Sequence, residues 1–341
     1  MMTKRVLVTG AGGPAALGTM KALADANIIF YFGDMDPLAS GLYLVPKDRR
    51  CILPRGDDPA FVDALFAFCC ENRIDVLWPT VDTELLPVAK ARSRFESMGI
   101  KVALAPQKTL ETCLDKWWLY QSCRFTVPCP ETIVTNRDAE RWSARFPRIV
   151  KPRRGSGSRG IHYIESLQAY QSLDVGEECI MQEYLPGEEY SIDVFVSHDA
   201  AQSIAVPRRR AKVDSGVAVT CETIHSTPLQ RFALLVAQRI ELSGIANVQV
   251  RLDHEGRPKL LEVNPRVAGT MILSVEAVVN LPQLMLNDTL GEPVTVPDDY
   301  RDLAVVRVLQ EVYLEPGEIR AMCIDSEIGN INSEEIPHSA A

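Results

Sequence analysis

Three oxygen-bearing side chains come together in the predicted hairpin NVQVRLDHEGRPKLLEVN. If Leu252 pairs with Lys259 across the turn, Gln249 lies opposite Glu262, and Asn264 follows on the same face. One carboxylate and two amide oxygens suit Mg²⁺, which commonly shares its other positions with water and substrate phosphates. The alternative is a hairpin whose outer face is merely polar.

A second group of residues could hold phosphate. Lys151 ends an apolar strand, and the loop RRGSGSRG of residues 153–160 follows with glycines, hydroxyls and cations. The backbone N–H groups of such a loop can close over phosphate oxygens. The GxxxxGK[ST] spacing of a P-loop is absent. A flexible surface loop is the alternative interpretation.

A third segment, MQEYLPGEE of residues 181–189, is a predicted strand that leads into a proline-glycine turn. Such a turn leaves backbone groups unpaired, and these groups can hydrogen-bond the edge of an adenine ring. Glu189 could accept hydrogen bonds from ribose hydroxyls, although an acid in a turn is more often simply solvated.

The elements that must position these residues form three predicted domains, 1–105, 106–180 and 181–341. Strands and helices alternate in the first, which predicts a Rossmann-like, parallel, doubly wound sheet. The second is a small α+β domain that carries the glycine-serine loop, and the third contains an antiparallel sheet with the hairpin. The predicted fold class is therefore α/β followed by α+β.

Composition excludes several classes of protein. The chain has 341 residues, 46% of them apolar, which is enough for two or three cooperating cores. A net charge of -9 argues against a nucleic-acid partner. The nine cysteines contain no CxxC pair, so we expect no disulfide scaffold or zinc site. No apolar run approaches the roughly 20 residues that span a bilayer, so we expect a cytoplasmic protein without a membrane partner.

Several segments, taken in chain order, resemble the ATP-grasp superfamily: Asp115-Lys116, IVKP with GSGSRG, QEYLPGEEYSIDV, NVQV and LLEVNPR. The synthetase halves of the carbamoyl-phosphate synthetase large subunit are the most similar members. The opening VLVTGAGGPAALG resembles the domain that precedes an ATP-grasp unit there. The resemblance spans residues 4–290 and implies a pre-ATP-grasp domain followed by a two-part ATP-grasp fold.

The resemblance also implies a binding site for ATP. The lysines would contact the phosphates, the glycine-serine loop would be a lid, and the segment at 183–185 would hold adenine, with Glu189 on the ribose. The implied residues are Lys116, Lys151, Gly155, Ser156, Gly157, Ser158, Glu183, Tyr184, Leu185 and Glu189.

Magnesium and the transferred phosphate have implied ligands as well. Gln249, Glu262 and Asn264 would bind Mg²⁺, with Mn²⁺ as an alternative, and Arg266 and Lys151 would act on the transferred phosphate. Many family members carry an acid where Gln249 stands, whereas the synthetase halves have glutamine in a similar NVQ context.

The resemblance implies a reaction. A small-molecule carboxylate, such as an amino acid or small acid, would react with ATP to give an acyl phosphate, which an amine attacks with release of phosphate. The sequence contains one ATP-grasp unit and no recognisable glutaminase, so synthesis of carbamoyl phosphate from bicarbonate is not expected as the whole activity. A homodimer is compatible with this interpretation.

Two other functions are compatible with parts of the sequence. One is a catalytically silent ATP-binding sensor. The other is a reductase that uses the first domain, where Asp34 or Asp36 stands near the position of a ribose-binding acid. The glycines at 10, 12 and 13 do not have the GxGxxG spacing, which disfavours the reductase.

Two charged groups have open roles. Asp82 and Glu84 could contact a substrate amine, or they could simply favour the N-terminal turn of a helix. Arg208, Arg209 and Arg210 could recognise the carboxylate substrate, whereas a solvated loop is the expected explanation for at least two of them.

Overall fold

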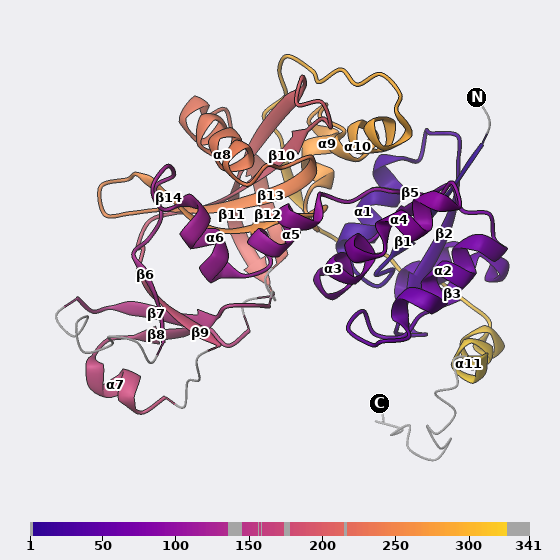
Figure 1. Cartoon of the computed structure of the whole chain (residues 1–341), viewed down its shortest axis with the longest axis horizontal. Helices are drawn as coiled ribbons and strands as arrows, with labels where there is room; N and C mark the ends of the chain where they lie inside the picture. The colour runs from indigo at the N-terminus through magenta and orange to yellow at the C-terminus, as the bar shows by residue number, and fades with distance from the viewer. Residues whose placement is uncertain are drawn as a thin grey trace.

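The computed structural model describes residues 3–135, 145–155, 157, 159–173, 178–214 and 217–325. Figure 1 shows a parallel sheet with its helices at the right, a large antiparallel sheet at the upper left, and a small sheet below it. The predicted fold class is confirmed by this arrangement. The predicted domain boundaries stay proposals, and one strand, β9 (Cys179–Glu183), runs across the boundary placed between 180 and 181.

The parallel sheet has the strand order β3-β2-β1-β4-β5. Its elements are β1 (Lys4–Thr9), α1 (Pro14–Ala22), β2 (Ile28–Asp34), β3 (Arg50–Ile52), α2 (Phe61–Glu71), β4 (Val76–Trp78), α3 (Asp82–Lys90), α4 (Arg92–Ser97) and β5 (Lys101–Val102). Val6, Leu7 and Val8 are wholly buried because helices cover both faces of the sheet. The strand order reverses between β1 and β4, the point where ligands collect in such sheets.

Two tight turns follow the strands at this reversal. Gly10 has a φ of +70°, and a Cβ there would collide with the side chains of Thr80 and Val81 after β4. The turn continues through Gly13 into Pro14, which occupies the first position of α1. The two strand ends therefore lie against each other at one edge of the sheet.

The small sheet has the antiparallel order β6-β9-β7-β8. It is formed by β6 (Thr132–Val134), β7 (Arg148–Pro152), β8 (His162–Ile164) and β9, with α7 (Leu167–Gln171) beside it. Among the described residues it has a small buried cluster formed by Val150, Ile164, Tyr170 and Met181. Helices α5 (Gln107–Cys113) and α6 (Lys116–Cys123) connect it to the parallel sheet.

The large antiparallel sheet has the order β14-β13-β10-β11-β12-β15. Its elements are β10 (Glu189–Val196), β11 (Ser203–Asp214), β12 (Val217–Thr223), α8 (Thr227–Arg239), β13 (Gly244–Leu252), β14 (Pro258–Asn264), α9 (Ile272–Glu276), α10 (Leu281–Leu290) and β15 (Ala304–Val306). Phe195 and Ile245 of this sheet share one buried cluster with Val8 and Phe32 of the parallel sheet. The two sheets are therefore packed as one body.

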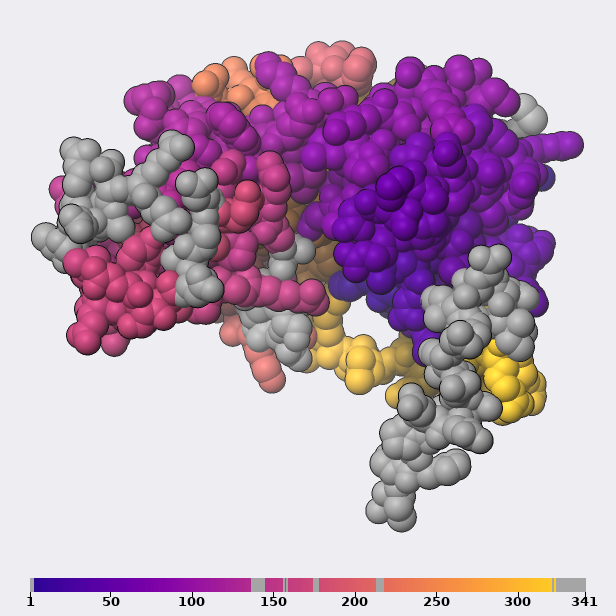
Figure 2. All heavy atoms as spheres, turned by 60° about the horizontal axis from the view of Figure 1, so that its bottom comes forward, coloured from indigo at the N-terminus to yellow at the C-terminus, as the bar shows by residue number. Residues whose placement is uncertain are grey.

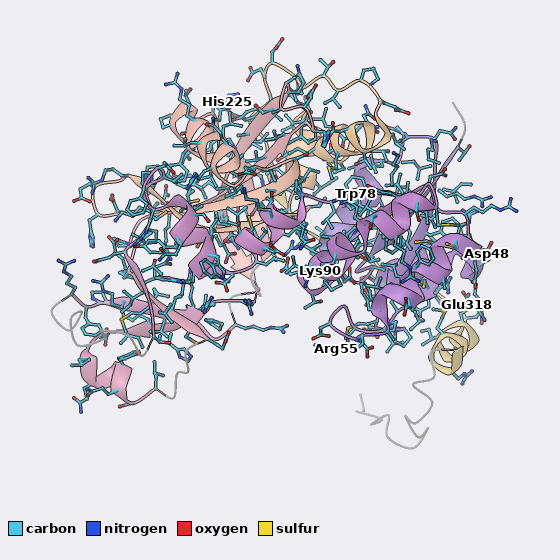
Figure 3. The ribbon with its side chains drawn as sticks, in the orientation of Figure 1. Asp48, Arg55, Trp78, Lys90, His225 and Glu318 are labelled. Atoms are coloured by element: carbon cyan, nitrogen blue, oxygen red, sulfur yellow. The ribbon has the colours of Figure 1, made fainter. Side chains whose placement is uncertain are left out.

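The last described helix, α11 (Pro316–Asp325), returns to the parallel sheet. Met322 is buried in the cluster that the two large sheets share, and Glu318 lies 3.7 Å from Arg50. Figure 3 shows Glu318 on the side of the molecule where Asp48 lies. Within the described ranges, no helix combines the length and apolar character needed to cross a bilayer.

Candidate active site

The hairpin of β13 and β14 has the predicted pairing at the site and a different pairing near its turn. Gln249 lies opposite Glu262, as the sequence predicts. The prediction that Leu252 pairs with Lys259 is wrong, because Leu252 pairs with Pro258. A β-bulge at Leu261 reconciles the two registers, since it inserts one residue into β14 between the turn and the site.

A cavity of about 730 Å³ lies where the three sheets meet. Figure 2 shows the small sheet, in magenta, and the parallel sheet, in indigo, on either side of deeper atoms of the C-terminal part. The lining includes every described residue that the sequence implicated in ATP or metal binding: Lys116, Lys151, Gly155, Gly157, Glu183, Tyr184, Leu185, Glu189, Gln249, Glu262, Asn264 and Arg266. Ser156 and Ser158 lie outside the described residues.

Two lysines line the cavity near Glu262. Lys116 Nζ lies 3.6 Å from Glu262 Oε2 and donates a hydrogen bond of 2.8 Å to the Gly155 carbonyl. Lys151 is only 7% exposed, and this burial lowers its pKa to about 8. The charge of Glu262 opposes that shift, whereas the charge of Lys116 reinforces it. A polyanion that enters the cavity would meet two cations, and one of them, Lys151, is already partly dehydrated by burial.

The three candidate metal ligands also lie together. Asn264 Nδ2 donates to Glu262 Oε1 over 3.3 Å, which leaves the Asn264 carbonyl oxygen as an acceptor beside Gln249 in the cavity lining. The described residues hold no cluster of three His, Cys, Asp or Glu side chains that could bind a metal. An oxygen-only set with one carboxylate fits Mg²⁺ that takes its remaining ligands from phosphate and water.

Arg266 forms a two-pronged ion pair with Asp82. Its Nε lies 2.6 Å from Asp82 Oδ1, and its terminal NH2 lies 3.1 Å from Oδ2. Asp82 begins α3 of the parallel sheet, whereas Arg266 follows β14 of the antiparallel sheet. Both residues were candidates from the sequence, but in separate roles. The structure places them in contact.

The segment implicated in adenine and ribose binding has its acids engaged. Glu183 accepts two hydrogen bonds from Lys259, of 2.7 and 2.8 Å, so an adenine contact would come from backbone groups of 183–185. Tyr184 packs edge-on against Tyr163 with ring centres 5.0 Å apart. Glu189 pairs with Arg210. A ribose would therefore meet an ion pair and not a lone carboxylate.

The start of the glycine-serine loop is anchored. Arg153 donates to both carboxylate oxygens of Asp115, at 3.2 and 2.8 Å. Asp115 is buried and also caps α6 by accepting from Trp117 N and Trp118 N. Because Lys116 is the next residue, the same cap fixes the backbone from which its ammonium group reaches Gly155.

A further acid lines the cavity from the parallel sheet. Glu84 is 7% exposed, and Thr9 donates a hydrogen bond to it from the end of β1. Burial raises the pKa of Glu84 to about 7, against the hydrogen bond from Thr9 and with the nearby charge of Asp34. Asp34 itself accepts a 2.8 Å hydrogen bond from Gly12 N. This wall of the cavity is rich in carboxylates.

The basic run is a strand, and the expectation of a solvated loop was wrong. Arg208 on β11 is wholly buried and pairs with Asp193 at 2.6 Å. Arg209 pairs with Glu222 across the sheet at 2.7 Å. Alternation along β11 turns Arg208 and Arg210 to one face of the sheet and Arg209 to the other. Arg210 thereby reaches the cavity, whereas Arg208 does not line it.

Two polar residues were missed, one in the cavity lining and one buried beneath it. Asn247 lines the cavity and donates a 2.7 Å hydrogen bond to Asp193 Oδ1, which is wholly buried. The signal for Asn247 was its position two residues before Gln249, because residues two apart share a face of a strand. The signal for Asp193 was a lone acid inside the apolar strand EYSIDVFV.

Comparisons with known proteins agree with this geometry. Residues 6–103 match the family "PylC-like, N-terminal domain", and residues 176–312 match "ATP-grasp in the biosynthetic pathway with Ter operon". The D-alanine--D-alanine ligase of Aquifex aeolicus is 24% identical over 161 residues, 43% of this chain and 55% of the relative. The carbamoyl phosphate synthase large chain of Thermomicrobium roseum is 27% identical over 170 residues, 43% of this chain and 15% of the relative.

Solved structures with the same fold include a synthetase and a ligase. The ADP complex of N5-carboxyaminoimidazole ribonucleotide synthetase has a TM-score of 0.72 at 14% identity, over 91% of this chain and 82% of that one. The L-amino acid ligase from Bacillus licheniformis has a TM-score of 0.66 at 18% identity, over 85% and 75%. The chain spans about half the length of the Aquifex aeolicus relative and a small part of the synthase large chain.

Proposed function

We propose that this chain, in which an ATP-grasp domain follows a PylC-like N-terminal domain, is an ADP-forming carboxylate-amine ligase. The observation that carries the proposal is the presence of Lys151 beside the Lys116–Glu262 ion pair in the lining of one cavity between the three sheets. Such a cavity can hold a triphosphate and a second substrate side by side. A cytoplasmic location is part of the proposal, since the reaction consumes ATP.

The residues of the cavity would have different roles in phosphoryl transfer. Lys116 and Lys151 hold the phosphates, and Arg266 faces the charge that develops on the transferred group. Gln249, Glu262 and Asn264 would hold Mg²⁺, which supplies further charge stabilisation when it is bound. The carboxylate substrate attacks the terminal phosphorus, ADP leaves, and the resulting acyl phosphate is a far better electrophile than the carboxylate.

The substrates we propose are small molecules. Two proteins with a related sequence or fold are named as ligases of amino acids, which supports an amino acid as the carboxylate. The amine would approach from the wall formed by the parallel sheet, where Asp34 and Glu84 can attract a cation. A homodimer is compatible with this scheme.

The proposal is tested by ADP release in the presence of Mg²⁺ over a panel of amino acids and small acids, offered singly and in pairs. We expect ADP formation to require a carboxylate and to rise when the right amine is added. An ATP-binding sensor would bind MgATP and release no ADP with any pair. Formation of AMP and pyrophosphate would contradict the acyl-phosphate chemistry.

The glycine-serine loop is expected to close over bound nucleotide, because an acyl phosphate must be kept from water. Cleavage by trypsin between Arg153 and Arg159 should be fast in the free protein and suppressed by MgATP. Cleavage at the exposed Arg73, which lies between α2 and β4, serves as the control and should not change. Equal loop cleavage in both conditions would count against a lid.

The first domain is expected to bind no dinucleotide. Gly12 N already donates to Asp34, and Ala15 stands where the strict GxGxxG fingerprint has its third glycine. NAD and NADP should leave the melting temperature unchanged, whereas MgADP should raise it because it binds the folded state. Micromolar affinity for either dinucleotide would revive the reductase interpretation.

A further inference from the structure

We propose that Asp82 is a positioning residue for phosphoryl transfer, and that it acts by fixing the guanidinium group of Arg266. The inference rests on the proposed function, in which Arg266 faces the transferred phosphate. It assigns to the first domain a part in a step whose other residues lie on α6 and on or next to the two antiparallel sheets.

The ion pair leaves Arg266 little freedom. Its Nε and NH2 both donate to Asp82, and its NH1 donates to the Val267 carbonyl over 3.1 Å. A guanidinium group has five N–H donors in one plane, so these three bonds determine the orientation of that plane. The remaining donors belong to a side chain that lines the cavity. Arg266 also lies within electrostatic reach of Glu262, the candidate metal ligand.

Asp82 is itself held by a backbone that cannot shift easily. A Cβ on Gly10 would collide with Thr80 and Val81, and a Cβ on Gly56 would lie 2.9 Å from Glu84 N. The segment 80–84 is thus packed tightly against two glycines, at which even a Cβ atom would not fit. Thr80 Oγ1 further ties it to β1 through a 2.7 Å hydrogen bond to the Thr9 carbonyl. Asp82 therefore offers Arg266 a fixed anchor.

A fixed guanidinium is useful because it needs little reorganisation when charge develops on the transferred phosphate. Asp82 also pairs with Arg266 through two charge-assisted hydrogen bonds, of 2.6 and 3.1 Å. Without this partner the side chain would be free to turn toward the acids Asp34 and Glu84 on the same wall. Binding of ADP alone does not require an oriented Arg266, because no charge develops on a transferred phosphate in that complex.

The experiment compares the binding of MgADP with that of MgADP plus fluoroaluminate, which mimics the transferring phosphoryl group. We expect Asp82→Asn to weaken the fluoroaluminate complex about 10-fold or more, as transition-state mimics report such contacts, and to leave the dissociation constant of MgADP within about 2-fold. Asp82→Glu, which keeps the charge, should recover part of the loss. Asp36→Asn removes a carboxylate from the same cavity wall without touching Arg266 and is the matched control.

A double-mutant cycle identifies the route of the effect. In an Arg266→Met background, Asp82→Asn should cause no further loss, because residues that act as a unit are not additive. Additive losses, equal weakening of both complexes, or an unchanged fluoroaluminate complex in Asp82→Asn would each overturn the inference. A wild-type protein that binds MgADP but gains nothing from fluoroaluminate would overturn it as well. A wild-type protein that fails to bind MgADP would instead refute the proposed function.

Discussion

Replacing Glu262 by glutamine is expected to lower turnover by about 100-fold or more, the scale on which the loss of a main electrostatic group acts. Glu262 supplies the one full negative charge among the three candidate ligands, and it lies 3.6 Å from Lys116. The amide keeps most of the shape of the side chain, so the folded structure should persist. Steady-state ADP release at saturating MgATP measures the effect.

The control for this variant is Glu255→Gln in the turn of the same hairpin. Glu255 is exposed, and the ion pair described for its side chain is with Arg257 at 2.8 Å. Because a surface ion pair contributes little, Glu255→Gln should change turnover by less than 2-fold. The melting temperatures of both variants should stay close to that of the wild type. A fully active Glu262→Gln protein would return the hairpin to its interpretation as a polar sheet edge.

Trapping the intermediate provides a second measurement on the same residue. Hydroxylamine added without the amine acceptor should yield a hydroxamate from the wild-type reaction and much less from Glu262→Gln, provided that the acyl phosphate forms before the amine binds. Adding Mn²⁺ at increasing concentration should restore part of the activity if the variant has lost metal affinity. Hydroxamate formation at the wild-type rate in the variant would separate Glu262 from phosphoryl transfer.

Replacing Lys151 by methionine is expected to abolish measurable turnover while stabilising the free protein. Burial costs the charged ammonium group its hydration, which is why its pKa is lowered to about 8. An apolar side chain of similar length avoids this cost, so the free energy of unfolding should rise by on the order of 1–3 kcal/mol near pH 7. Urea denaturation of the free variant measures its stability, steady-state ADP release measures its turnover, and calorimetric titration with MgADP measures its affinity for nucleotide.

The pH dependence of this stability has a defined sign. The usual pKa of lysine is 10.5, so between pH 8 and pH 10.5 the unfolded chain holds more protons at this position than the folded chain. Wild-type stability therefore gains from Lys151 as the pH rises through that window. The advantage of Lys151→Met should be greatest below pH 8 and should vanish near pH 10.5.

The matched control for this variant is Lys108→Met, which removes an exposed lysine that pairs with Glu241. It should change neither the pH profile nor the affinity for MgADP, because a solvated surface pair contributes little. A Lys151→Met protein that is less stable than the wild type at pH 7 would mean that its attraction to Glu262 outweighs the cost of burial. Unchanged affinity for MgADP would remove Lys151 from the phosphate site.

Much of this architecture could be predicted because it depends on the order and periodicity of neighbouring residues in the sequence. The alternation of strands and helices predicted the parallel sheet. The pairing of Gln249 with Glu262 was predicted from an assumed Leu252–Lys259 pair that does not form, and the bulge in β14 restores it. The turn-side register was predicted wrongly, because a bulge adds a residue without changing the apolar pattern of LLEV. The burial of Arg208 was not predicted, because a run of arginines does not indicate that one of them pairs with a buried acid such as Asp193.

Contacts between distant segments were beyond the sequence. Asp82 and Arg266 are separated by 184 residues, and neither residue type nor spacing indicates that they meet. The pairing of Glu183 with Lys259 is similar, since the two residues belong to different sheets. These ion pairs depend on how three sheets pack around one cavity. Local patterns and the resemblance to ATP-grasp proteins therefore predicted many of the residues that line the cavity, and packing determined which of them neutralise each other.

The bulge at Leu261 has a consequence for anyone who transplants this hairpin into a designed scaffold. In a regular strand, neighbouring residues point to opposite faces, so an apolar residue and a carboxylate at consecutive positions could not share a binding surface. Leu261 and Glu262 both line the cavity here, because two residues of β14 oppose one residue of β13. An idealised hairpin without the extra residue would keep Gln249 opposite Glu262 but would lose the apolar side chain of Leu261 from the cavity lining.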